Sequence, residues 1–153
     1  MATQKQKNGE FGEVYVKKHV YCPKCKSKKH TFVQLPSGFP CADLICNFCG
    51  YLAQVKTCYS SNTDQCPRML PGAGWEPLAK RMTKNIFYPI YVVVRNRRDP
   101  MKDVSIFYIP AELQTSKMFI RSRASVVKKT KRVVKGVRFD LSKAIAEPLK
   151  LRL

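Results

Sequence analysis

The hydrophobic residues near the start of the chain recur at helical spacing. Phe11, Val14 and Tyr15 share one face, which predicts an amphipathic helix over residues 9–20. The opposite face of this segment is charged, as expected of a helix that packs on a larger core. A second helix is expected over residues 75–84, because an acid and a proline occupy its first turn.

Runs of β-branched and aromatic residues between turn signals predict strands elsewhere. These strands cover residues 31–35, 42–46, 51–58, 86–95 and 104–109, and a last short strand at 137–141 precedes a helical turn capped by Ser142. The run at 86–95 is apolar on both faces, which is typical of a central strand covered on two sides. Residues 60–74 are rich in Ser, Asn, Asp, Pro and Gly, which predicts a loop. This order of elements predicts an α/β fold class, a mixed β-sheet flanked by helices.

Composition limits the class of protein. The 153 residues, 44% of them hydrophobic, are enough for one domain with a buried core. The net charge of +19 predicts a polyanionic partner, with nucleic acid the first choice. The first ten residues are polar, and the longest apolar run is far shorter than the roughly 20 residues of a membrane helix. We therefore expect a soluble protein of the reducing cytoplasm, with no membrane partner and an oligomeric state that the sequence leaves open.

Four of the seven cysteines form two pairs. Cys22 and Cys25 make one C-x2-C motif, Cys46 and Cys49 make the other, and twenty residues lie between the motifs. Each tight turn directs two thiolates at one ion, and four thiolates complete the tetrahedron of structural zinc. Buried free cysteines are the alternative. The remaining three are expected to be small buried hydrophobic residues: Cys41, Cys58 and Cys66.

The second cysteine pair also forms the turn of a predicted hairpin, and this turn sets the strand register. If Cys46 and Tyr51 are the last paired residues, Asp43 lies opposite Gln54, and Lys56 shares their face. A carboxylate, a carboxamide oxygen and an amine on one face are suited to holding a divalent cation and readying a water molecule. A solvated strand face is the alternative interpretation of the same residues.

These residues resemble a motif of the PD-(D/E)XK superfamily of metal-dependent nucleases. Gln54-Val55-Lys56 begins eleven residues after Asp43, and the helix before the hairpin carries Glu13. The cysteine motifs around them are similar, more narrowly, to those in the zinc-containing catalytic domain of DpnI-like methyl-directed restriction endonucleases. The resemblance implies a restriction-endonuclease-like core and a DNA endonuclease that hydrolyses phosphodiester bonds. It also implies a role in the restriction of adenine-methylated DNA.

The resemblance assigns roles to four residues. It implies that Asp43, Gln54 and Glu13 hold a catalytic magnesium ion, and that Lys56 orients or deprotonates the attacking water. Gln54 departs from the pattern, because most superfamily members have an acid there. No winged-helix module like that of the methyl-directed enzymes fits the sequence. Residues 1–153 are therefore expected to form a single nuclease domain with the zinc site (Cys22–Cys49) embedded in it.

The last third of the chain contains a basic tract. Phosphate neutralisation is the expected use of such a tract, and a solvated charged surface is the alternative. The +19 charge and the zinc motif fit a second class of protein equally well, a non-enzymatic zinc-ribbon protein that binds nucleic acid. The cations of the tract are Arg121, Arg123, Lys128, Lys129, Lys131, Arg132, Lys135 and Arg138.

Overall fold

The fold is taken from a computed structural model that describes residues 1–122, 125–127, 132–134 and 136–153. The longer helices are α1 (Gln4–His19) and α2 (Trp75–Met82), and short 3-10 turns cover Ala111–Leu113, Ser116–Met118 and Leu141–Lys143. Neither α1 nor α2 is long and apolar enough to cross a membrane, and the described part of the chain has no other helix that is. The strands are β1 (Phe32–Gln34), β2 (Leu44–Cys46), β3 (Leu52–Ser60), β4 (Met69–Gly74), β5 (Ile90–Asn96), β6 (Val104–Ile109), β7 (Phe119–Arg121), β8 (Ser125–Val127), β9 (Arg132–Val134), β10 (Gly136–Asp140) and β11 (Leu149–Lys150).

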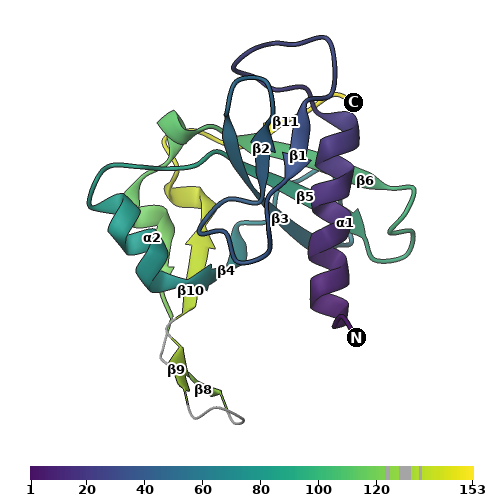
Figure 1. The fold of residues 1–153 in the computed structure, drawn as a ribbon. Helices are drawn as coiled ribbons and strands as arrows, with labels where there is room; N and C mark the ends of the chain where they lie inside the picture. The colour runs from purple at the N-terminus through teal and green to yellow at the C-terminus, as the bar shows by residue number, and fades with distance from the viewer. Residues whose placement is uncertain (123–124, 128–131, 135) are drawn as a thin grey trace.

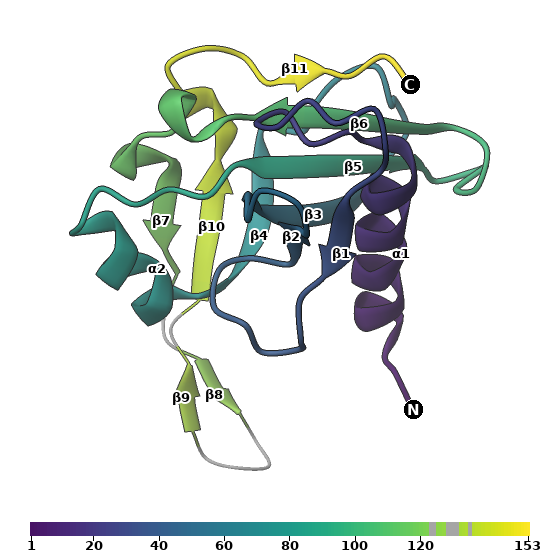
Figure 2. The ribbon, with the colours of Figure 1, turned by 45° about the horizontal axis from the view of Figure 1, so that its top comes forward.

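The main sheet is mixed, as the sequence predicts. Within the described residues it has six strands in the order β1-β2-β3-β5-β6-β11. The central pair, β3 and β5, is parallel and the other pairs are antiparallel. Helix α1 lies across one face of this sheet, against β1, β3 and β5 (Figures 1 and 2). The mixed α/β architecture expected from the sequence is therefore confirmed.

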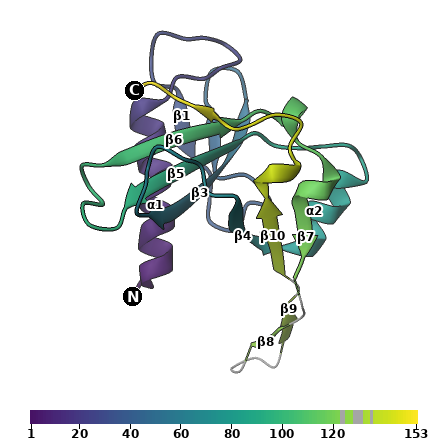
Figure 3. The ribbon, with the colours of Figure 1, turned by 180° about the vertical axis from the view of Figure 1, so that it is seen from behind.

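A second, smaller sheet and α2 lie at the other side of the main sheet. This sheet has the order β4-β10-β7, and its strands are antiparallel. Strands β8 and β9 pair with each other rather than with either sheet and project away from both, as Figures 1 and 3 show. The molecule is thus layered, with α1, the main sheet and the β4-β10-β7 layer in succession.

Two hydrophobic cores occupy the two faces of the main sheet. Residues of β5 alternate between them, because successive side chains of a strand point to opposite faces. Tyr91 and Val93 pack in the core beneath α1, whereas Ile90, Val92 and Val94 pack in the core beneath the second sheet. All five are at most 1% exposed, which confirms a central strand in this run. The strand covers Ile90–Asn96, so the expected start at residue 86 is four residues too early.

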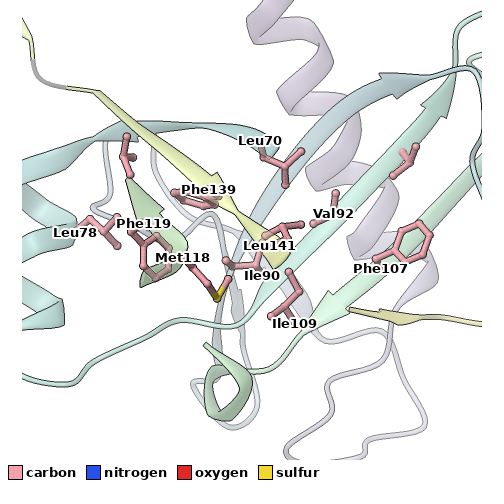
Figure 4. Close-up of a cluster of buried hydrophobic side chains, with 12 residues drawn as sticks. Leu70, Leu78, Ile90, Val92, Phe107, Ile109, Met118, Phe119, Phe139 and Leu141 are labelled. Carbon is pink, nitrogen blue, oxygen red and sulfur yellow. The ribbon is translucent and has the colours of Figure 1, made fainter. Parts of the chain in front are cut away.

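The core beneath the second sheet draws on segments that are distant in the sequence. Figure 4 shows Leu70 of β4 beside Val92 of β5, and Phe139 of β10 beside Phe119 of β7. The rings of Phe119 and Phe139 meet edge to face, with centroids 5.0 Å apart. Cys41, Cys58 and Cys66 are half-buried and pack against this core, in agreement with their expected role as small hydrophobic residues.

The first helix begins five residues earlier than its hydrophobic spacing predicts. Thr3 caps it, because its hydroxyl accepts a hydrogen bond from the N–H of Gln6 while the Gln6 side chain accepts one from the N–H of Thr3. This reciprocal capping box stabilises a polar first turn that contributes nothing to the hydrophobic pattern. The Thr-x-x-Gln spacing is the sequence signal for the true start.

Two expectations about the segments after β3 are wrong. Residues 60–74 are not a loop throughout, because Met69–Gly74 forms β4, which pairs with β10. The turn after β10 is capped by Asp140 rather than Ser142, since the Asp140 carboxylate accepts hydrogen bonds from the N–H and hydroxyl of Ser142. The pattern also does not indicate the short strands β7 and β11.

Candidate functional site

The four paired cysteines converge at one point. The Sγ atoms of Cys22 and Cys49 are 3.6 Å apart, those of Cys25 and Cys46 are 3.8 Å apart, and all four lie within 4.8 Å of one another. A zinc tetrahedron with Zn–S bonds of about 2.3 Å has sulfur–sulfur edges of about 3.8 Å. The donor set and its dimensions therefore fit a structural zinc ion with a full sulfur shell.

The two turns that carry the cysteines have the same backbone geometry. The N–H of Lys26 donates to the carbonyl of Cys22, and the N–H of Gly50 donates to the carbonyl of Cys46. Both donors have positive φ, 51° at Lys26 and 77° at Gly50. Gly50 adopts this conformation without a steric penalty, whereas Lys26 carries a Cβ in the left-handed region.

Hydrogen bonds and burial act in opposite directions on these thiols. Burial raises the pKa of Cys46, but hydrogen bonds from the Thr31 hydroxyl and from the N–H groups of Cys49 and Phe48 outweigh it and lower the pKa to about 6. Burial raises the pKa of Cys22 to about 12. Zinc would stabilise all four thiolates, because its positive charge offsets the cost of burying them. Thr31, whose Oγ1 is 3.0 Å from the Cys46 Sγ, is a supporting residue that sequence reasoning missed.

The strand register beyond the cysteine turn agrees with the prediction. Leu44 pairs with Ala53 and Ile45 with Leu52, so Asp43 lies one residue further, opposite Gln54. The N–H of Asp43 donates to the carbonyl of Ala53 at 2.9 Å, which continues the ladder past the end of β2. Asp43, Gln54 and Lys56 thus extend from the same end of the hairpin.

Asp43 and Lys56 are half-buried and interact electrostatically. The Oδ2 atom of Asp43 accepts a 2.7 Å hydrogen bond from the N–H of Val55. Burial raises the pKa of Asp43, and the Val55 hydrogen bond and the Lys56 charge only partly counteract it. Burial lowers the pKa of Lys56, and the charge of Asp43 opposes that shift. The Lys56 Nζ lies 5.4 Å from the centre of the Phe139 ring, which limits its contact with water.

Glu13 faces the same region from α1. Its Oε2 accepts a 2.9 Å hydrogen bond from Nε2 of Gln34 in β1, which holds the carboxylate against the sheet. Burial raises the pKa of Glu13, the Gln34 hydrogen bond lowers it, and the charge of Asp43 raises it further. A divalent cation beside Glu13 would favour its ionised form and so oppose the effects of burial and of the Asp43 charge.

Gln54 is the most buried of the four predicted site residues, with 9% of its surface exposed. It lines a narrow cavity with Leu78, Phe87 and Phe119, among others. Its backbone N–H donates to the carbonyl of Pro89, immediately before β5. Its burial opposite Asp43 gives a reason for a neutral side chain here, because a second buried carboxylate would be costly to ionise.

The basic tract is only partly described. Arg121 ends β7 and Arg138 lies in β10, and both side chains are exposed. Arg132 begins β9, and nothing further is described of its side chain. The other tract cations lie outside the described residues: Arg123, Lys128, Lys129, Lys131 and Lys135.

A mixed sheet covered by α1, with a four-cysteine cluster at the turn of one hairpin, defines an α/β protein with a predicted zinc site. A family model described as "DpnI: Dam-replacing family" matches residues 1–148, and the chain belongs to this family. The resemblance to DpnI-like proteins is confirmed at this level. No curated protein matches the chain.

Proposed function

We propose that this protein is a magnesium-dependent DNA endonuclease of the PD-(D/E)XK type, in a single domain that contains the zinc site. The observation that carries the proposal is that the charge of Asp43 acts on both Lys56 and Glu13, raising the pKa of each. Membership of the DpnI, Dam-replacing family supports a nuclease and a role in methylated-DNA restriction or Dam replacement. The +19 charge supports DNA as the partner.

The acidic residues of this site suit a hard cation. Asp43 uses one carboxylate oxygen for the Val55 N–H, so its other oxygen remains for a ligand, and Glu13 likewise bonds Gln34 through one oxygen. Gln54 adds an amide oxygen in the proposal. Magnesium, when bound there, would polarise the scissile phosphate and acidify a water molecule.

Lys56 acts on the attacking water in this proposal. Burial lowers the pKa of Lys56, so its amine reaches the neutral form more readily than that of an exposed lysine. The charge of Asp43 attracts the protonated amine and partly opposes this shift. The neutral amine is the form that can accept a proton. Lys56 therefore orients the water and accepts its proton while the water attacks in line at phosphorus.

The alternative, a zinc-ribbon protein that only binds nucleic acid, treats Asp43 and Lys56 as a cross-strand ion pair. Among the described residues, the close ion pairs are Arg68 with Asp140 and Lys150 with Asp64. Asp43 and Lys56 interact at a longer range, and a half-buried lysine without a close counter-ion is costly for a purely structural role. This observation favours the nuclease over the binding module.

Plasmid cleavage tests the proposal. Purified protein with bound zinc is incubated with magnesium and plasmid DNA from Dam-methylating and non-methylating hosts. We expect cleavage that requires magnesium. The difference in cleavage rate between the methylated and the unmethylated plasmid measures methyl dependence. Asp43→Ala is expected to reduce cleavage about a hundredfold or more with little change in DNA affinity. Equal cleavage by the parent and Asp43→Ala would exclude the assigned site and favour the binding module.

The basic tract, Arg121 to Arg138, contributes phosphate contacts in this proposal. Such contacts supply affinity and register, and they carry no base information. Strands β8 and β9, which the tract includes, project from the body of the molecule, a placement suited to reaching along a duplex (Figure 3).

A further inference from the structure

A basic surface covers the zinc-binding turns and includes none of the residues proposed for cleavage. Between Glu13 and Asp43 the chain has six lysines and no acidic residue. Four of the lysines lie in or directly after the Cys22–Cys25 turn, and all four side chains are exposed. We name these the knuckle lysines: Lys24, Lys26, Lys28 and Lys29.

The carboxyl end of α1 extends this surface. Lys17 and Lys18 are exposed in its last turn. His19 follows them, and its pKa is lowered by burial and then by the charges of His30 and Lys18. The Nδ1 atom of His30 lies 3.3 Å from the carbonyl oxygen of Val20, the C-cap of α1, so the helix end lies close to the zinc-binding turns. Six lysines therefore share one region, and residues 14–42, which supply them, contain no carboxylate to neutralise their charge.

Exposed aromatic rings lie among these lysines. Tyr21 is 51% exposed and stacks on the exposed His30, with ring centroids 4.3 Å apart and planes 8° from parallel. Phe48, in the second cysteine turn, is 78% exposed. An open depression of about 600 Å³ lies beside the stack, lined by Tyr21, Cys22, Pro23, Lys26, Ser27 and Lys28. Cations interleaved with exposed rings are the pattern of a nucleic-acid surface, where cations bind phosphates and rings contact bases or sugars.

This surface is separate from the other basic region. In Figure 1 the loop between α1 and β1, which carries the knuckle lysines, lies at the top of the molecule, and β8 and β9 lie at the bottom. Asp43 is three residues from Cys46, or about 10 Å along a strand. A DNA segment on the zinc-binding turns would thus be near the proposed cleavage site without occupying it.

We propose that the knuckle lysines bind DNA phosphates and form a second contact surface on the zinc-binding turns. The inference rests on DNA being the partner in the proposed function. It assigns the zinc site a role beyond holding the fold, because zinc then shapes the turns that present these cations.

The test compares two triple variants with equal loss of charge. In the first, Lys24, Lys28 and Lys29 are replaced by Gln, which leaves Lys26 and its strained backbone in place. In the control, the exposed cations of the β5–β6 connection, Arg97, Arg98 and Lys102, are replaced by Gln. Binding to a 30-base-pair duplex is measured by fluorescence anisotropy from low to high salt, without magnesium and without chelator. Zinc content and thermal melting establish that both variants are folded.

Removing three phosphate contacts should flatten the slope of log affinity against log salt by about two to three. We expect this change for the lysine variant and a change of less than about one for the control. Equal slopes for the parent and the lysine variant, or equal changes in both variants, would overturn the inference. Preference for an RNA duplex over DNA, or no DNA binding by the parent, would overturn it as well.

The result is independent of the cleavage assay. If Asp43→Ala cuts as well as the parent and the lysine variant still loses its salt dependence, the proposed active site is wrong and the second contact surface is supported. If Asp43→Ala is inactive and the lysine variant binds as the parent does, the proposed active site is supported and the second contact surface is wrong.

Discussion

At the scale of single residues, the proposed site depends on charges that are kept partly from water. Burial raises the pKa of Asp43 and Glu13 and lowers that of Lys56, so each group is displaced toward its neutral form. Groups displaced in this way exchange protons nearer to neutral pH, which acid–base catalysis requires. If Asp43 and Lys56 formed only an exposed ion pair, burial would not shift their pKa values in these directions.

Two substitutions of Lys56 separate proton transfer from simple attraction of phosphate. Lys56→Ala should lower cleavage about a hundredfold or more, because the water loses the group that readies it. Lys56→Arg keeps the positive charge but cannot give up a proton near neutral pH, so it should lose nearly as much activity. Single-turnover cleavage rates measure both, and DNA affinity serves as the control. Full activity in Lys56→Arg would show that the charge alone is needed.

Gln54→Glu tests the proposal that Gln54 binds the magnesium ion through its neutral amide. A third carboxylate adds charge to a hard-cation site, so activity should survive and saturate at lower magnesium. The new acid is buried near Asp43, so its pKa is raised, and it must lose its proton to bind a cation. As the solution is acidified, the variant should therefore lose cleavage activity at a higher pH than the parent does. Rate–pH profiles at two magnesium concentrations measure this, and an unchanged acid limb would show that Gln54 does not contact the cation.

At the scale of elements, α1 packs on β3 through a glycine. A Cβ built on Gly12 would lie 1.9 Å from the Oγ1 of Thr57 and 3.3 Å from the Cγ1 of Val55. That Oγ1 is buried and has no hydrogen-bond partner among the residues that the structure describes. The close approach keeps Glu13, the next residue, near the hairpin.

Two Gly→Ala substitutions in α1 should therefore have opposite effects. Gly12→Ala forces atoms apart and should destabilise the fold by about 1–3 kcal/mol. Gly9→Ala meets nothing within 4 Å and should stabilise it by about 0.5–1 kcal/mol through helix propensity. Urea denaturation measures both, and adding Thr57→Ala to Gly12→Ala should recover part of the loss. Equal effects at the two positions would contradict the packing described for α1.

The cysteine turns join α1, β1 and the β2–β3 hairpin. We predict one zinc ion per chain, and Cys46→Ser should lose it and melt at a lower temperature or aggregate, because zinc binding and folding are linked. Elemental analysis and thermal melting measure the two effects. Cys58→Ser, outside the cluster, is a matched control that should keep its zinc. A parent protein without zinc would refute the assignment.

At the scale of the whole molecule, the positive charge should make DNA binding steeply salt-dependent. If the protein neutralises roughly six phosphates, log affinity should fall with log salt at a slope near −5. Replacing two tract cations, Lys128 and Lys129, by Gln should flatten the slope by about two. Titrations at several salt concentrations measure this. An unchanged slope would show that the tract is a solvated surface that does not touch DNA.

The sequence by itself determined the features that depend on neighbours in the chain. The C-x2-C spacing predicts the four-sulfur cluster, because a tight turn is a local structure. The hairpin register, which places Asp43 opposite Gln54, follows from the length of the turn at Cys46–Cys49 in the same way. The unbroken apolar run identifies β5 as a central strand covered on both faces.

Only the tertiary structure decided the features that depend on distant partners. Residues 69–74 contain proline and glycine, which predicts a loop. Pairing with β10 makes them a strand instead. Pro71 is tolerated there because β4 lies at a sheet edge. Gly12 weakens a helix locally, yet the contact with Thr57 requires it. The approach of Glu13 to Asp43, thirty residues apart, likewise arises only when α1 packs on the sheet. Such contacts depend on the folded chain as a whole, and no local pattern encodes them.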